Sequence, residues 1–179
     1  MVSRYLTTLA LAIILLCAAA TASAQTPVER RSATGFVVDL TKDIVFDPTT
    51  WAPASLSFAA TRLDWNSSQV FFRQGVLERN PRFTVDGRSP GAPIGYGEGN
   101  RKILGDTLAI LQMSAVNNVS THLLERLLAR RYPDRRKLLR TVSWIERIAF
   151  ASYWSHRLSA AHFEQWRTNE RLAREFGYK

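Results

Sequence analysis

The stretch that decides the fold is residues 100–131, NRKILGDTLAILQMSAVNNVSTHLLERLLARR. Its apolar residues recur at steps of three and four, which is the period of an α-helix with one apolar face. Asn100 is a good N-cap, so we expect a helix from Asn100 to about Arg131 that turns this face toward a core. The face is formed by Leu104, Leu108, Leu111, Ala115, Val119, His122 and Leu123.

The chain after this helix predicts a turn and then more helix. Tyr132-Pro133-Asp134 favours a helix end followed by a new start, because proline and aspartate suit a first turn. The same period then continues to Tyr178, which is long for a globular helix, so we expect a break near residues 155–159. The apolar face is formed by Leu138, Val142, Ile145, Ala149, Ser152, His156, Ala160 and Phe163.

The chain before residue 100 predicts one more helix and two irregular segments. Leu56, Ala60 and Leu63 begin a helical face over about residues 52–74, and Gly75 is a plausible terminator. Residues 80–100 are rich in proline and glycine and predict a loop, while residues 25–50 predict a flexible or irregular leader. The fold class expected is therefore all-α, an antiparallel bundle of about four amphipathic helices over residues 51–179.

The N-terminal residues 1–24 have the pattern of a secretory signal peptide. Arg4 is the basic start, residues 6–20 are apolar, and Ala22-Ser23-Ala24 fits a signal-peptidase site. Cys17 is the only cysteine, so cleavage leaves a chain without disulfides. We expect an exported protein, periplasmic or secreted, which the apolar segment tethers to the inner membrane if it stays uncleaved.

The positive charge is concentrated in the second half of the chain. Residues 25–100 carry eight basic and eight acidic side chains, whereas residues 101–179 carry fifteen basic and seven acidic ones. Such a field attracts anions. Export separates the protein from cytosolic nucleic acid, so the expected partners are lipid headgroups, lipopolysaccharide or wall polymers, with peripheral membrane contact; a merely solvated charged turn is the alternative.

The predicted anion site lies around the turn at residues 132–134. Cations are favoured at a helix C-terminus but disfavoured in a first turn, so three basic residues at a helix start invite a compensating anion. The predicted anion-binding residues are Arg130, Arg131, Arg135, Arg136, Lys137 and Arg140.

The polar residues inside the two long helical stretches argue against membrane spans. Residues 104–124 include Asp106 and His122, and residues 138–154 include Arg140, Glu146 and Arg147. A charge at the centre of a span costs roughly 2.5–3.5 kcal/mol on insertion scales. The sequence therefore favours a soluble or peripheral bundle.

The three histidines predict no metal site. With a turn near residue 133, His122 and His156 would lie far apart on antiparallel helices, which favours two separate core histidines. His162 is expected to be exposed. We predict neither a metal nor a cofactor.

A polar motif surrounds the helix over residues 52–74 and its following loop. It has the form Asp-x-x-Ser-Ser…Gly-x-x-Glu-x-Asn-Pro. The motif resembles one found in small bacterial helical proteins of uncharacterised function. The resemblance covers about twenty residues, with a further match at Asn169. It implies a helical fold and no particular activity. The residues predicted to form it are Asp64, Ser67, Ser68, Glu78 and Asn80.

Three function classes follow from these features. The leading hypothesis is a non-enzymatic envelope or secreted protein that presents a basic end to an anionic partner. The alternatives are a hydrolase that uses Asp64, Glu78 and a histidine, with His156 as the catalytic candidate, and a small-molecule-binding bundle. Convergence of Asp64, Glu78, Asn80 and His156 in one open pocket would favour the enzyme.

Overall fold

A computed structural model describes residues 33–178, and these residues are helical with no named β-strand among them. The predicted all-α class is therefore confirmed, while the predicted signal segment, residues 1–24, lies outside the described residues. The four α-helices are α2 (Ala33–Val45), α3 (Pro48–Phe72), α4 (Tyr96–Arg131) and α5 (Arg136–Glu175); two 3-10 turns are η1 (Pro81–Phe83) and η2 (Pro133–Arg135).

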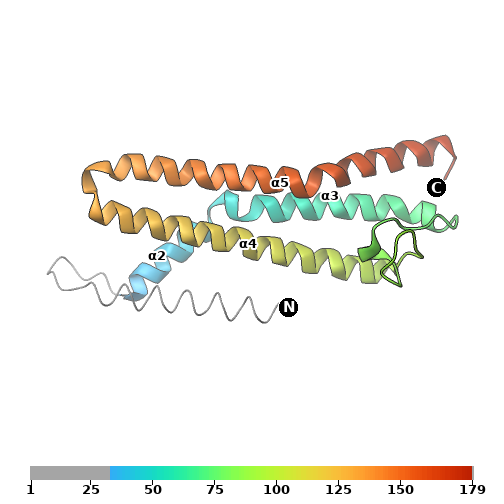
Figure 1. Ribbon diagram of the computed structural model, residues 1–179, viewed down its shortest axis with the longest axis horizontal. Helices are drawn as coiled ribbons and strands as arrows, with labels where there is room; N and C mark the ends of the chain where they lie inside the picture. Colours follow the sequence, from blue (N-terminus) through green and yellow to red (C-terminus); the bar gives the residue numbers. More distant parts are fainter. Residues whose placement is uncertain (1–32, 179) are drawn as a thin grey trace. The chain divides into compact units, whose positions relative to one another are not determined.

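The chain divides into two compact units at Lys42 and Asp43. Within the second unit, α3, α4 and α5 pack side by side and consecutive helices are antiparallel (Figure 1). α3 has 25 residues and α5 has 40, and α3 starts partway along the other two helices (Figure 1). The end of the α4–α5 hairpin therefore extends beyond the start of α3.

Local sequence explains where α3 begins and ends. The Asp47 side chain accepts a hydrogen bond from the Thr49 N–H, and Pro48 occupies the first helical position, where a missing N–H costs nothing. After the helix, Gly75 adopts a positive φ of 81°, a conformation that glycine tolerates best. The terminator predicted at Gly75 thus fits the structure, and the helix starts four residues earlier than predicted.

Three other predictions about the helices differ from the structure. Residues 33–45 are helical where an irregular leader was expected, and α4 starts at Tyr96 rather than Asn100. The break expected near residues 155–159 is absent, since α5 is continuous through them. Ser155 and Ser159 are both buried, and the Ser159 hydroxyl donates to the Ser155 carbonyl within the same helix, so small side chains let α5 pack closely without a break.

The apolar core is small and lies near the 73–95 loop. Trp65, Phe83, Ile94 and Ile103 form it, with Phe72 packed against them. The helix α4 approaches Trp65 closely at Gly99, where an added Cβ would lie 2.3 Å from the indole ring. This cluster joins α3, the loop and the start of α4.

Most of the remaining helix contacts bury small or polar side chains, which corrects the predicted core faces. Leu104, Leu108, Leu138, Val142 and Ile145 were predicted to face the core, yet each is more than half exposed. The helical period was right and His122 is buried as predicted, but most of the other buried positions differ from the predicted ones. The buried stripes are Ser114, Asn118 and His122 on α4, and Ser143, Arg147, Ala151, Ser155 and Ser159 on α5.

No helix within residues 33–178 has both the length and the apolar character needed to cross a membrane.

Candidate functional site

The six basic residues predicted to bind anions lie together at the turn between α4 and α5. Arg130 and Arg131 are in the last turn of α4, Arg135 precedes α5, and the other three start α5. All six are exposed. We call them the basic end: Arg130, Arg131, Arg135, Arg136, Lys137 and Arg140.

Much of the charge of the basic end is uncompensated. Within residues 33–178, Arg135, Arg136, Lys137 and Arg140 form no ion pair, and the first turn of α5 holds no acidic residue and no side-chain cap. Arg131 instead lies over the Tyr132 ring, with 5.8 Å from its guanidinium carbon to the ring centroid. The start of α5 thus carries basic side chains with no acidic residue in its first turn, and this local positive charge favours an anion.

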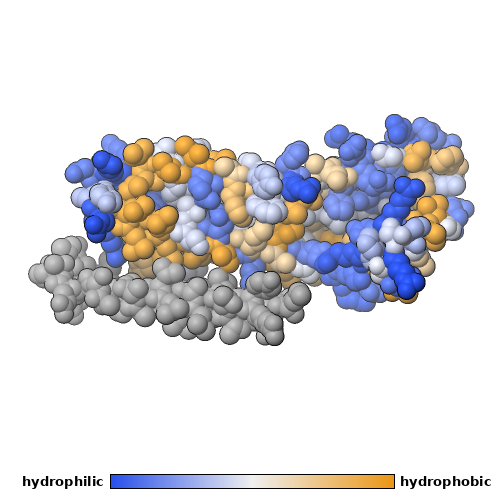
Figure 2. All heavy atoms as spheres, in the orientation of Figure 1, coloured by the Kyte–Doolittle hydropathy of each residue, from blue (hydrophilic) through white to orange (hydrophobic). Residues whose placement is uncertain are grey.

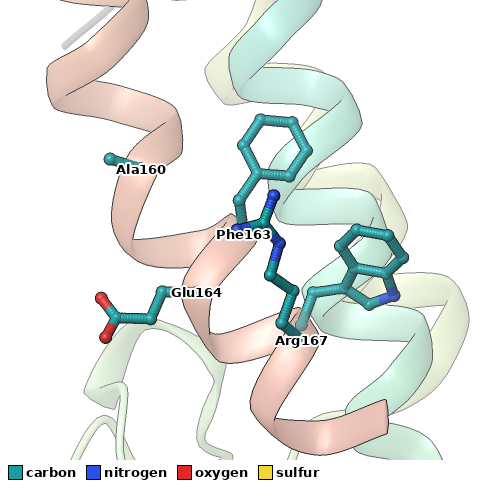
Figure 3. Close-up of a pocket in the computed structure, with 5 residues that line it drawn as sticks. Ala160, Phe163, Glu164 and Arg167 are labelled. Carbon is teal, nitrogen blue, oxygen red and sulfur yellow. The ribbon is translucent and has the colours of Figure 1, made fainter.

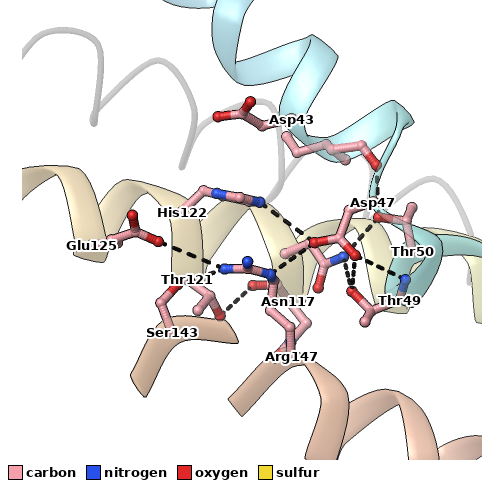
Figure 4. A network of polar contacts seen from close by, with 12 residues as sticks. Asp43, Asp47, Thr49, Thr50, Asn117, Thr121, His122, Glu125, Ser143 and Arg147 are labelled. Carbon is pink, nitrogen blue, oxygen red and sulfur yellow. Dashed lines mark hydrogen bonds and ion pairs between the residues drawn. The ribbon is translucent and has the colours of Figure 1, made fainter. Parts of the chain in front are cut away.

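Arg147 does not belong to this exposed charge. Its side chain is buried, and its Nε donates to Asp47 Oδ2 at 2.8 Å (Figure 4). Its guanidinium also lies 3.8 Å from Glu125 and donates to Ser143. Arg147 therefore joins α5 to the start of α3 and adds no exposed positive charge.

The same network extends to α4 through Asn118. Its amide donates to the hydroxyls of Thr49 and Thr50, at 2.8 and 2.7 Å. The Thr49 hydroxyl in turn donates to Asp47 (Figure 4). Three helices thus meet in one buried polar cluster. Among the described residues, Asn118 Oδ1 and His122 Nε2 are buried in it without a hydrogen-bond partner.

The protonation states in this cluster follow from burial and charge. Burial alone would raise the pKa of Asp47, but hydrogen bonds from Thr49 and the charge of Arg147 outweigh it, so this pKa lies below the usual value. Burial, and then Arg147, lower the pKa of His122. His122 Nε2 lies 3.7 Å from Asp47 Oδ2, but the imidazole is neutral at pH 7, so this contact is not an ion pair.

A second polar cluster joins the middle of α3 to the second half of α5. Asp64 Oδ2 lies 2.7 Å from His162 Nδ1, and the Asn169 amide donates to Ser67 and Ser68, both at 3.0 Å. His162 is half-buried here, so its predicted exposure was wrong. The arrangement fits a structural role for Asp64, Ser67 and Ser68, because each helps to fix α5 against α3.

The other predicted site residues lie apart from this cluster. Glu78 accepts a hydrogen bond from the Asn80 N–H at 2.7 Å, and the Asn80 side chain caps η1 by accepting from the Arg82 N–H. His156 is exposed on α5 rather than in the core. Asp64 and His156 thus share no contact with the hydrogen-bonded pair Glu78 and Asn80, and the hydrolase alternative gains no assembled site from these four residues.

Two hollows on the surface also leave the catalytic candidates apart. One, of about 580 Å³, is lined only by residues of α5, and Figure 3 shows Glu164 pointing away from Phe163 and Arg167. The other, of about 350 Å³, lies between α3 and α5 beside Ser67 and Asn169. Neither borders Asp64, Glu78 or His156.

Comparison with protein-family models, curated proteins and solved structures finds no match to this chain.

Sequence reasoning missed Asp47, Arg147 and the partner of Asp64. Asp47 reads as a helix cap, which it is, but its second oxygen binds a residue 100 positions away. His162 and Asn169 are spaced seven apart, which places them on one helix face, and that spacing was the available signal for a shared partner on α3.

Proposed function

We propose that this protein is a non-enzymatic exported protein whose basic end binds an anionic surface. The observation that supports this most is the group of exposed basic residues around the start of α5, four of which have no ion-pair partner within residues 33–178. The surface would be one of phosphate-bearing lipid headgroups, lipopolysaccharide or wall polymer. No metal, cofactor or catalytic step is part of the proposal.

Several features of the structure favour binding at this end over a solvated charged turn. The basic residues come from the end of α4, from η2 and from the start of α5, so the turn brings six of them together. Their only acidic neighbour in the turn is Asp134. Because one turn carries six basic side chains, the basic end can contact several phosphate groups at the same time.

The test is a charge-removal variant with a matched control. Arg135→Ala/Arg136→Ala/Lys137→Ala should weaken binding to phosphatidylglycerol vesicles roughly 100-fold, given about 1 kcal/mol per basic residue near an anionic surface. The control, Arg167→Ala/Arg171→Ala/Arg174→Ala, removes three exposed charges from the other end of α5 and should bind almost as tightly as the original chain. Vesicle co-sedimentation at low salt measures both.

Further arms of the same experiment identify the source of the phosphate. Phosphatidylcholine vesicles, lipopolysaccharide and a soluble phosphate-rich wall polymer replace the anionic vesicles in turn. Equal binding of the two triple variants to every anionic target would contradict the proposal.

A further inference from the structure

The half of the α4–α5 hairpin next to the basic end exposes an apolar face. Leu124 and Leu127 lie on α4, and Leu138, Val142 and Ile145 lie on α5; each is 50–60% exposed. Figure 2 shows hydrophobic residues gathered over this half of the two helices, with hydrophilic residues at the hairpin end. We call these five residues the hairpin apolar face.

The face is exposed because α3 is too short to cover it. Asp47, just before α3, contacts Arg147, and Thr49 contacts Asn118, so the start of α3 is level with these two residues. The hairpin continues beyond that level toward residues 131 and 136. Its large apolar side chains therefore lie outside the three-helix packing.

Apart from the basic end, several charged side chains in this half of the hairpin have partners within the three-helix unit. Glu146 accepts a hydrogen bond from Thr121 at 2.8 Å, and Arg147 is paired with Asp47. Arg126 is paired with Asp43 at 2.7 Å. Outside the basic end, placing the apolar face in a non-polar medium would thus leave few charges unpaired between residues 117 and 147.

The inside of the bundle is also unlike that of a protein surrounded only by water. Away from the small core near the 73–95 loop, its buried stripes consist mainly of serine, alanine and asparagine together with His122 and Arg147, while several leucine, valine and isoleucine side chains are exposed. Small residues and hydrogen-bonded polar residues between helices, with large apolar residues outside, are typical of helices packed among lipid chains. A contiguous apolar patch beside a basic cluster fits a membrane interface.

We propose that the hairpin apolar face inserts among the acyl chains of an anionic lipid bilayer while the basic end contacts its headgroups. This inference rests on the proposed function and narrows its target to a lipid membrane. The basic end supplies charge complementarity with anionic headgroups, and the adjacent apolar face distinguishes a bilayer from lipopolysaccharide phosphate or wall polymer alone.

A local fluorescence experiment tests the insertion. In full-length chain carrying Cys17→Ser, an environment-sensitive dye is attached to Val142→Cys on the apolar face or, as control, to Arg171→Cys, an exposed site farther along α5. Vesicles contain phosphatidylglycerol and phosphatidylcholine, with or without lipids carrying a quencher on the acyl chain. The dye at residue 142 should shift to the blue and be quenched, whereas the dye at residue 171 should do neither.

The possible results separate the two proposals. A chain that binds the vesicles while the dye at residue 142 stays in water overturns the insertion and leaves the proposed function standing. A chain that does not bind anionic vesicles at all overturns both. A dye at residue 142 that is already shielded before vesicles are added shows that a second copy or another part of the chain covers the face, which also overturns the insertion.

A matched pair of variants provides an independent readout. At about 1 M salt, where charges are screened beyond about 3 Å, binding should depend mainly on apolar contact. Leu138→Ser/Val142→Ser should then weaken vesicle binding about tenfold or more, and Val76→Ser/Leu77→Ser, which alters two equally exposed apolar residues in the loop, should not. Equal effects of the two pairs would overturn the inference.

Discussion

At the scale of single residues, Asp47 holds the start of the bundle together. One of its oxygens caps α3, and the other accepts from buried Arg147 on α5. Each role satisfies a group that would be costly to bury alone: the free N–H groups of a helix start, and a guanidinium. One carboxylate therefore links the local start of a helix to the packing of a distant one.

Removing Arg147 should be strongly destabilising. Arg147→Met leaves Asp47 with less compensation in a buried cluster, which typically costs about 3–5 kcal/mol. Arg140→Met, on the same helix but exposed, should change stability by less than about 0.5 kcal/mol. Urea unfolding followed by circular dichroism measures both, and a similar small loss in the two variants would show that the pair does not hold the helices.

His122 should make stability depend on pH. Its folded pKa lies below its unfolded value, so the unfolded chain binds the proton more readily and stability falls as pH drops below about 6.5. This one group changes the free energy of unfolding by at most about 1.4 kcal/mol per pH unit. Asp47, whose folded pKa is also lowered, contributes to stability above about pH 4 and loses that contribution at lower pH.

The variant His122→Phe removes the part of the pH dependence of the unfolding free energy that comes from His122. Unfolding free energies measured between pH 7.5 and about pH 5 should then fall less steeply than in the original chain. His156→Gln is the control, because it removes an exposed histidine instead of the buried one. An identical pH profile for His122→Phe and the original chain would argue against a neutral, buried His122.

At the scale of elements, the start of α4 depends on a glycine. Gly99 lies against the Trp65 ring with no room for a Cβ, whereas Gly105, also in α4, has open space around its Cβ position. Gly99→Ala should lower the free energy of unfolding by about 1–3 kcal/mol through overpacking. Gly105→Ala should leave this free energy unchanged or raise it by up to about 1 kcal/mol through helix propensity. Thermal unfolding compares the two, and equal melting temperatures would contradict the close approach.

The elements also show how far sequence patterns reach. Turn chemistry at Gly75 and Tyr132-Pro133 located the end of α3 and the turn of the hairpin to within a few residues. The pattern did not show that α5 runs unbroken, because a buried serine pair is compatible with either a helix end or a close helix contact. Only the burial of Ser155 and Ser159 in the folded unit distinguishes the two.

At the scale of the whole three-helix unit, polarity is arranged with polar and small groups inside and many large apolar groups outside. Two polar clusters, around Asp47 and around Asp64, tie α5 to α3 at separate levels, while a small aromatic and aliphatic core lies near the loop. The basic end and the hairpin apolar face lie next to each other where α3 no longer covers the hairpin. That adjacency is the basis of both proposals.

By itself, the sequence determined the helical class, the helical period, the turn near residue 133 and the concentration of basic residues around it, because these depend on neighbours a few positions apart. The tertiary structure decided which face of each helix is buried and which distant residues pair, such as Asp47 with Arg147 and Asp64 with His162. A period states that a helix has distinct faces, but the face that is buried depends on the side chains that the neighbouring helix offers. Here the short α3 offers threonine, serine and aspartate, so the serine and asparagine stripes turn inward and the leucine stripes remain outside.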